Sequence, residues 1–225
     1  RNGTIADIST LVQDIESVLV NGIDNSPDNN NRIDRFSLDL ANTLKERLIR
    51  EPRKPTLRMS NLGKPDRKLW LEMNKPEEAE PLRADTYLKF LYGDLIESLL
   101  IFLVELSGHT VEGMQDEQNL YGVKGHRDVV IDGHLTDAKS ASTFSYQKFK
   151  DGKLKDDDPF GYIDQLDSYL EAAKDDPIVT DKDKASFLVM DKTLGHILLD
   201  THQKQNKDYE KFINDKREMI KGEIP

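Results

Sequence analysis

Two aspartates and a lysine surround a hairpin signal in the middle of the chain. Asp132-Gly133 lies between alternating residues, which is the best short-range mark of a two-residue hairpin. A type I′ turn there pairs position 128 with 137, so Asp128 and Asp137 would face each other with Cβ atoms about 4.5–5.5 Å apart. Lys139 follows two residues later on the same face. Two carboxylates and an ammonium suit a hard divalent cation and a water nucleophile.

This prediction depends on the register of the hairpin. A slip of one residue would place the two aspartates on opposite faces of the sheet. Exposed acids beside a turn are therefore the structural alternative.

Glu97 is a third carboxylate of interest. It lies in a predicted helix at residues 87–106, which is apolar on most sides, and an unpaired carboxylate is costly in such a setting. Gly93, one turn earlier, leaves a bare spot where another backbone can approach. Glu97 is therefore either held in a structural salt bridge or directed into a metal site.

Hydrophobic periodicity predicts the elements that must position these residues. Residues 1–50 read as a helical annex, with helices at 4–20 and 33–50 separated by an Asn-rich loop at 24–31, and residues 51–225 read as the main domain. Pro52 and Pro55 are expected to end the second helix. The main domain contains predicted strands within 122–141, a helix at 162–173, a strand pair at 185–191 and 196–199, and a closing helix at 209–221. This order predicts an α/β fold built on a small mixed sheet flanked by helices.

The composition limits the classes of protein that need to be considered. The 225 residues contain no cysteine, which excludes disulfides, a thiol nucleophile and cysteine-ligated zinc or iron–sulfur clusters. The longest apolar run, residues 99–104, is far shorter than the roughly 20 residues that span a bilayer. No signal peptide is evident, although the chain starts at Arg1. We expect no membrane partner and a cytoplasmic location.

The charge is distributed unevenly. Residues 45–75 contain ten basic and four acidic residues and so carry +6, which leaves −16 for the rest of a chain whose net charge is −10. A basic face of this kind can meet a polyanion while the acidic remainder suppresses nonspecific binding. A solvated charged loop is the simpler interpretation of the same run.

Four short motifs then resemble a known family. The segments at 93–97 (Gly-Asp-Leu-Ile-Glu), 125–128 (Gly-His-Arg-Asp) and 137–139 (Asp-Ala-Lys) follow the order of the PD-(D/E)XK nuclease superfamily, which has the restriction-endonuclease-like fold. Gln165 and Tyr169 match the Gln-x-x-x-Tyr motif of the RecB-like and CRISPR-associated exonuclease branch. The resemblance covers about residues 56–200, and the annex and last helix have no counterpart in it.

The resemblance implies specific roles at the matching positions. Asp128 and Asp137 would bind Mg²⁺ or Mn²⁺ with the Ala138 carbonyl, Lys139 would orient the attacking water, and Glu97 would complete the acidic shell. Further residues would contact DNA or support the site, and these are Arg58, Ser60, Lys64, Arg67, Lys68, His126, Ser140, Gln165 and Tyr169. His126 could equally bond a neighbouring group, and Trp70 fits core packing better than base stacking. Many relatives have a cysteine that binds an iron–sulfur cluster near the segment that corresponds to residues 58–70. This chain has no cysteine, so the resemblance implies no such cluster here.

The sequence therefore predicts a Mg²⁺-dependent deoxyribonuclease. The resemblance favours an exonuclease of DNA recombination, repair or phage replication, with DNA and a recombination or replication protein as partners. It implies a bacterial cytoplasm, or that of a host if the protein is phage-encoded. One alternative is a nuclease-fold DNA-binding or assembly module without activity, although the intact Glu97, Asp128, Asp137 and Lys139 argue against it. A metal-dependent hydrolase of small phosphates is a third possibility.

Overall fold

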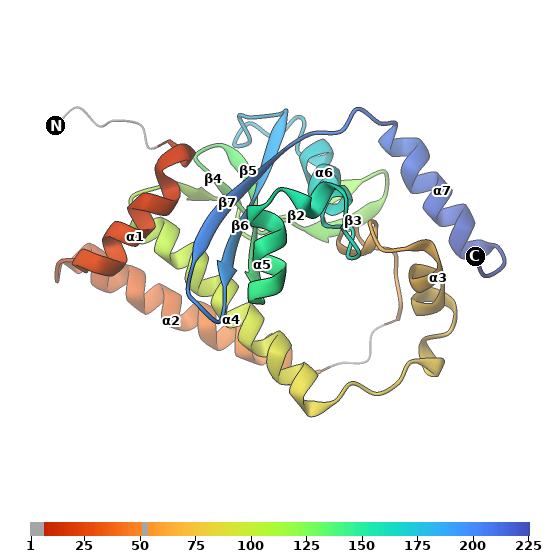
Figure 1. Ribbon diagram of the computed structural model, residues 1–225, viewed down its shortest axis with the longest axis horizontal. Helices are drawn as coiled ribbons and strands as arrows, with labels where there is room; N and C mark the ends of the chain where they lie inside the picture. The colour runs from red at the N-terminus through yellow and green to blue at the C-terminus, as the bar shows by residue number, and fades with distance from the viewer. Residues whose placement is uncertain (1–6, 51–53) are drawn as a thin grey trace.

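A five-stranded mixed sheet forms the centre of the molecule in the computed structural model, which describes residues 7–50 and 54–225 (Figure 1). The strand order is β1-β4-β5-β6-β7, and β5 and β6 form the parallel pair while the other neighbours are antiparallel. The strands are β1 (Val111–Glu112), β4 (Val129–Ile131), β5 (His134–Ala141), β6 (Lys184–Asp191) and β7 (Ile197–Gln203). The predicted α/β class, a small mixed sheet flanked by helices, is confirmed.

The sheet separates two apolar cores, and each core is closed by a pair of helices. On one side, α1 (Leu11–Asn21) and α4 (Ala84–Leu106) pack against Ala138 of β5 and its neighbours. On the other side, α5 (Thr143–Lys150) and α6 (Tyr162–Ala172) pack against Leu135 of the same strand. Because successive side chains of a strand point to opposite faces, β5 contributes to both cores.

The turn between β4 and β5 has the predicted geometry. Asp132 and Gly133 both have positive φ values, 49° and 81°, as a type I′ turn requires. The register pairs Ile131 with His134 and Val129 with Thr136. The register predicted from the sequence is therefore confirmed.

The structure corrects the prediction for the N-terminal helices. The predicted Asn-rich loop is wrong, because α2 (Pro27–Leu48) begins inside it. Ser26 accepts a hydrogen bond from the Asn29 backbone N–H at 3.3 Å, and Pro27 occupies the first helical position, so a cap and a proline start this helix. The first helix starts at Leu11 after a 3₁₀ turn, η1 (Ile8–Thr10); residues 4–6 and Pro52 lie outside the described residues.

Strand β3 (Val123–His126) lies within the predicted strand region 122–141, but it pairs with β2 (Glu117–Leu120) in a separate hairpin. Several other short elements had no counterpart in the prediction. They are α3 (Asp66–Asn74), β1, β2, helix α5, and the 3₁₀ turns η2 (Met59–Asn61), η3 (Pro76–Glu78) and η4 (Lys153–Lys155).

Helix α3 buries one residue, Leu69, and its stability depends on distant partners. Trp70 Nε1 donates to the Gly222 carbonyl oxygen at 3.0 Å, and Lys216 of α7 (Tyr209–Lys221) lies 2.6 Å from Asp66. Figure 1 shows α3 and α7 side by side at one end of the molecule, opposite α1 and α2. Within the described part of the chain, no helix is both long enough and apolar enough to cross a membrane.

Candidate active site

The hairpin brings the two predicted aspartates and the lysine together. Asp128 immediately precedes β4, and its Oδ2 accepts a hydrogen bond of 3.0 Å from the backbone N–H of Ala138. On β5, Lys139 Nζ lies 2.6 Å from Asp137 Oδ2, and the two side chains are only 18% and 13% exposed. These three charges therefore form one compact, largely buried group at the middle of the sheet.

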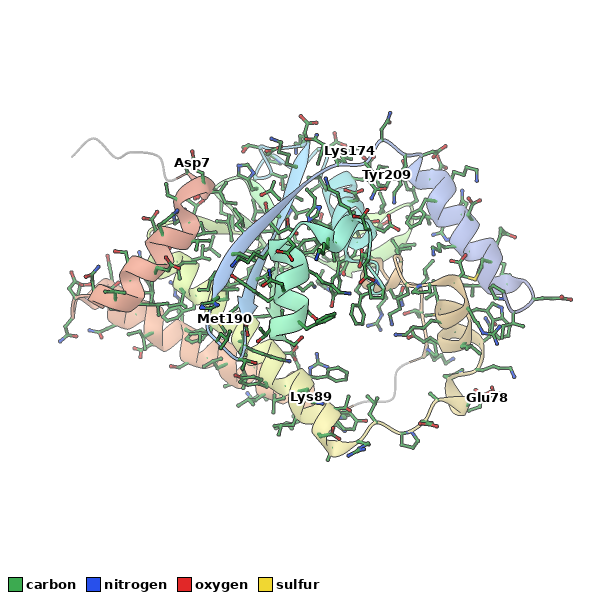
Figure 2. The ribbon with its side chains drawn as sticks, viewed as in Figure 1. Asp7, Glu78, Lys89, Lys174, Met190 and Tyr209 are labelled. Atoms are coloured by element: carbon green, nitrogen blue, oxygen red, sulfur yellow. The ribbon has the colours of Figure 1, made fainter. Side chains whose placement is uncertain are left out.

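Glu97 reaches the same strand from helix α4. Its Oε1 accepts hydrogen bonds from the Ser140 backbone N–H at 3.1 Å and from Ser140 Oγ at 3.4 Å. Gly93 permits this approach, because a Cβ atom at that position would lie 3.0 Å from Ser140 Oγ. Ser140 pairs in register with Met190, whose label in Figure 2 marks this end of the sheet.

The carboxylates are crowded enough to change their acidity. Burial is the largest cause that raises the pKa of Asp128 well above its ordinary value, and the nearby charges of Asp137 and Glu97 raise it further. Burial likewise raises the pKa of Glu97 to about 7, although Lys139 opposes this shift. Such crowding of negative charge favours the binding of a cation.

Lys139 keeps its charge in this setting. Burial lowers the pKa of the ammonium group, but the charges of Asp137 and Asp128 and the contact with Asp137 raise the pKa above its ordinary value. The side chain therefore stays protonated at neutral pH. It supplies a fixed positive charge and does not act as a base.

Tyr162 is a site residue that the sequence reasoning missed. Lys139 Nζ lies 4.8 Å from the centre of the Tyr162 ring, in a cation–π contact. Burial raises the pKa of the Tyr162 hydroxyl, and the charges of Asp137 and Glu97 add to the shift while Lys139 opposes it. The available signal was the position of Tyr162 three residues before Gln165, which places both on one face of α6.

The Gln-x-x-x-Tyr residues lie on α6 behind the hairpin. Tyr169 is buried, and a Cβ atom at Gly125 would lie 2.5 Å from its hydroxyl oxygen. Burial raises the pKa of Tyr169, and the charges of Asp128 and Asp137 raise it further. Gln165 is half-buried one turn earlier. Tyr169 thus packs close to both aspartates and supports their position.

The remaining predicted DNA contacts lie at the surface, outside the buried charged group. Arg58, Ser60 and Lys68 are exposed. His126 is exposed at the end of β3, where it pairs in register with Glu117.

Two further basic residues already have partners within the chain. Lys64 forms an ion pair of 2.7 Å with Glu72, and Arg67 donates to the Pro225 carbonyl oxygen at 3.0 Å. The count of basic residues in the sequence therefore overstates how many cations of residues 45–75 are free to contact DNA.

The oxygens of the site fit a divalent cation that keeps part of its water shell. Among residues 7–50 and 54–225, no three His, Cys, Asp or Glu side chains are arranged to hold a metal ion by themselves. Mg²⁺ does not need such a cage, because it commonly uses one or two carboxylates together with water and phosphate oxygens. The crowded oxygens of Asp128, Asp137 and Glu97 fit that chemistry, and Asp137 Oδ2 is a buried oxygen without a well-aligned hydrogen-bond donor.

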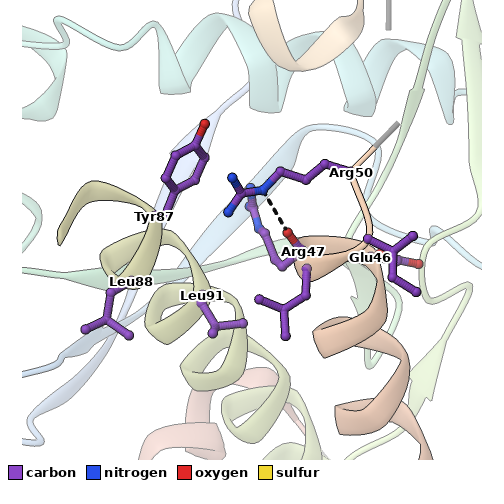
Figure 3. A pocket seen from close by; sticks show the side chains of 8 residues that line it. Glu46, Arg47, Arg50, Tyr87, Leu88 and Leu91 are labelled. Carbon is purple, nitrogen blue, oxygen red and sulfur yellow. Dashed lines mark hydrogen bonds between the residues drawn. The ribbon is translucent and has the colours of Figure 1, made fainter. Parts of the chain in front are cut away.

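A cavity of about 460 Å³ lies elsewhere, between the end of α2 and the start of α4 (Figure 3). Arg50 Nε donates to the Arg47 carbonyl oxygen at 3.3 Å, and the Arg50 guanidinium lies 3.6 Å from the centre of the Tyr87 ring. Leu88 and Leu91, on α4 with Tyr87, also line the cavity. Because the four charged residues of the hairpin and α4 do not line it, this cavity is separate from the candidate site.

Comparison with known proteins gives remote likenesses. No family model matches the chain, and no curated protein matches it. A phage-related exonuclease from Haemophilus somnus 129PT has 14% identity and a TM-score of 0.47, with 78% of this chain and 93% of that chain covered. LHK-Exo in complex with dAMP has 13% identity and a TM-score of 0.46, with 74% and 85% covered. At this distance, the chemistry of this chain must be argued from its own residues.

Proposed function

We propose that the protein is a Mg²⁺- or Mn²⁺-dependent DNA phosphodiesterase of the PD-(D/E)XK type. The observation that supports this proposal most is the contact of Lys139 with Asp137 at 2.6 Å, beside Asp128, whose pKa is raised by burial and by both carboxylate neighbours. Acidic oxygens next to a permanently charged ammonium match the needs of phosphodiester hydrolysis, in which negative charge grows on the phosphate.

The cation would be held by Asp128 and Asp137, with the Ala138 carbonyl and Glu97 as further oxygen ligands. When bound, it would lower the pKa of a water molecule and offset charge on the phosphate. The backbone N–H of Ala138 already fixes one oxygen of Asp128. The ligand is therefore oriented before any cation arrives.

The other residues orient and stabilise the reacting groups. Lys139 donates from its ammonium to a water and to a phosphate oxygen, and it remains charged throughout because of its acidic neighbours. Asp137 and the Tyr162 ring hold that ammonium from two sides. Tyr169, packed on Gly125 of β3, keeps the β2–β3 hairpin against α6.

We extend the proposal to exonuclease action on DNA ends, in recombination, repair or phage replication, with DNA and a protein of such a pathway as partners. The order of the four motifs, including Gln165 and Tyr169, supports this extension. The exposed Arg58 and Lys68 would contact the backbone phosphates.

The test is incubation of the purified protein with end-labelled single- and double-stranded DNA, with Mg²⁺ or with a chelator. We expect products only with the cation, and a ladder that shortens from one end if the enzyme is an exonuclease. Asp128→Ala should remove all cleavage, whereas Asp157→Ala, a control in an exposed loop, should not. Cleavage that survives in Asp128→Ala would refute the assignment.

A further inference from the structure

A pair of aromatic rings extends from Lys139 to the surface. The Tyr162 ring lies against the ammonium, and the Phe160 ring stacks on Tyr162 with centres 5.3 Å apart and planes 23° apart. Phe160 is nevertheless 55% exposed. A single exposed phenylalanine is ordinary, but this one is in direct stacking contact with a residue of the candidate site.

The backbone holds this pair rigidly. Both oxygens of Asp158 accept hydrogen bonds of 2.9 Å, from the N–H groups of Tyr162 and Ile163. Gly161, between the two rings, has a φ of 71°, and a Cβ atom there would lie 1.9 Å from the Gly63 carbonyl oxygen. The backbone between the two rings is therefore held in place without a ligand, which lowers the entropic cost of binding one.

The contact of Gly161 with Gly63 also joins the rings to the basic segment, residues 45–75. Gly63 lies between the exposed Arg58 and Lys68. Basic groups that follow a backbone, together with aromatic rings on which bases stack, are the combination used to bind single-stranded nucleic acids. Asp156 and Asp157 precede Phe160 in the chain and bring no positive charge to it, so an attraction at Phe160 has to come from the ring.

We propose that Phe160, backed by Tyr162, is a stacking platform for the base next to the cleaved phosphodiester. This inference rests on the proposed phosphodiesterase function. An open ring face accepts a base whose own face is free, so the platform selects an unpaired or terminal base over one inside a duplex. Phe160 is thus a residue of substrate positioning that contacts the DNA and none of the reacting atoms.

The first test is kinetic and uses single-stranded DNA. Loss of the ring in Phe160→Ala should raise KM roughly 5- to 100-fold, as expected for one base–aromatic stack, with kcat nearly unchanged. Phe160→Tyr keeps an aromatic ring and should therefore have the wild-type KM. Phe144→Ala is the matched control, because Phe144 is 74% exposed and its ring faces Lys148. An unchanged KM in Phe160→Ala, or an equal rise in Phe144→Ala, would overturn the proposal.

The second test separates this inference from the proposed function. In the Asp128→Ala background, which leaves the contact of Lys139 with Tyr162 in place, an oligonucleotide with 2-aminopurine at its end reports stacking by loss of fluorescence, with no cleavage needed. We expect quenching when Phe160 is present and a clear loss of quenching when Phe160→Ala is added to the same background. If the wild type cleaves no DNA, the phosphodiesterase proposal fails, and this binding result still decides the role of Phe160.

Discussion

At the residue scale, the centre of the site is a negative and a positive side chain two residues apart on β5. Asp137 and Lys139 point to the same face and form an ion pair, and Asp128 adds a second carboxylate from the neighbouring strand end. Glu97 brings a third carboxylate close to them; burial raises its pKa to about 7, Asp137 adds to this shift and Lys139 opposes it. The free protein therefore contains unfavourable charge repulsion that a cation would relieve.

Removing one of these charges should stabilise the cation-free protein. We expect Asp128→Asn to raise the stability by roughly 1 kcal/mol at pH 8, because like charges face each other across the hairpin. For a chain of this size, that change corresponds to a melting temperature roughly 2–4 °C higher.

Melting temperatures with and without Mn²⁺ measure both the charge repulsion in the cation-free protein and its relief by the cation. The wild type should gain stability with the cation and the variant should not. Asp175→Asn, at an exposed turn after α6, serves as the control for loss of an aspartate. A variant that melts lower than the wild type and still gains from Mn²⁺ would contradict this expectation.

Much of this site could be predicted from local sequence. Asp132-Gly133 determined the hairpin register, and that register placed Asp128 opposite Asp137. Glu97 was recognisable because a charged residue in an apolar helix needs a partner. The contact of Tyr162 with Lys139 joins α6 to β5 across more than twenty residues, and no local pattern encodes such a contact.

At the element scale, close backbone contacts position the parts of the site. Gly161 at the start of α6 touches Gly63, so no side chain fits between these two segments. Glycine is needed at both positions because the two backbones leave no room for a Cβ atom, and Gly161 also has a positive φ.

We expect Gly161→Ala to be far more destabilising than Gly152→Ala. Gly152 has a similar φ of 66° but nothing within 4 Å of its Cβ position, so its variant should lose about 1–2 kcal/mol from backbone strain alone. Gly161→Ala adds a clash with backbone, which costs roughly 1–3 kcal/mol more. Urea denaturation of the two variants measures the difference, and equal losses would argue against the close contact.

A buried histidine joins α1 to the hairpin turn. His109 lies 2.5 Å from Asp132 Oδ2 through Nδ1 and 3.0 Å from Asp14 Oδ2 through Nε2. Burial lowers the pKa of His109, but the two carboxylates more than compensate and raise the pKa above its ordinary value. Donation to both carboxylates requires the protonated ring.

This histidine should make stability depend on pH. Because the folded protein binds the His109 proton more tightly than the unfolded chain, its contribution is complete below about pH 6.5 and is lost as pH rises through the higher folded pKa. Denaturation at pH 6 and pH 8.5 should show this decline in the wild type, with a smaller decline in His109→Gln. Equal declines in the wild type and His109→Gln would exclude this role.

The elements themselves differed in how well the sequence predicted them. Helix α4 was found because its apolar pattern is long, and α7 because residues 209–221 show helical periodicity; the structure adds that Asp208 caps α7. The start of α2 was missed because asparagines suggest a loop, whereas the Ser26 cap and Pro27 decide the outcome. Helix α3 buries only Leu69 and depends on α7, a partner that is distant in sequence.

At the scale of the whole molecule, net charge alone misdescribes the surface. The chain carries −10, but the basic segment lies beside the candidate site at Gly63. Within that segment, Lys64 is paired with Glu72, so fewer cations are free than the sequence count suggests. Binding of DNA should therefore involve few phosphate contacts.

A modest salt dependence follows from this arrangement. If Arg58, Lys68 and one further cation contact phosphates, the slope of log K against log salt should be about −2 to −3. Lys68→Glu should weaken binding and reduce the slope by about 1, while Lys184→Glu, an equal charge reversal at the exposed start of β6, should not. Fluorescence anisotropy at several salt concentrations measures both. A slope unaffected by Lys68→Glu would remove this residue from the DNA interface.

The central claim is that the charged group on β5 cleaves phosphodiesters, and the rate of DNA cleavage in Mg²⁺ tests it most directly. Lys139→Ala should lower the rate by roughly 10²–10³-fold or more while the protein stays folded. Lys148→Ala removes a lysine of α5 that is paired with Asp157, and this variant should cleave at the wild-type rate. Equal rates for Lys139→Ala and the wild type, in preparations free of other nucleases, would contradict the account.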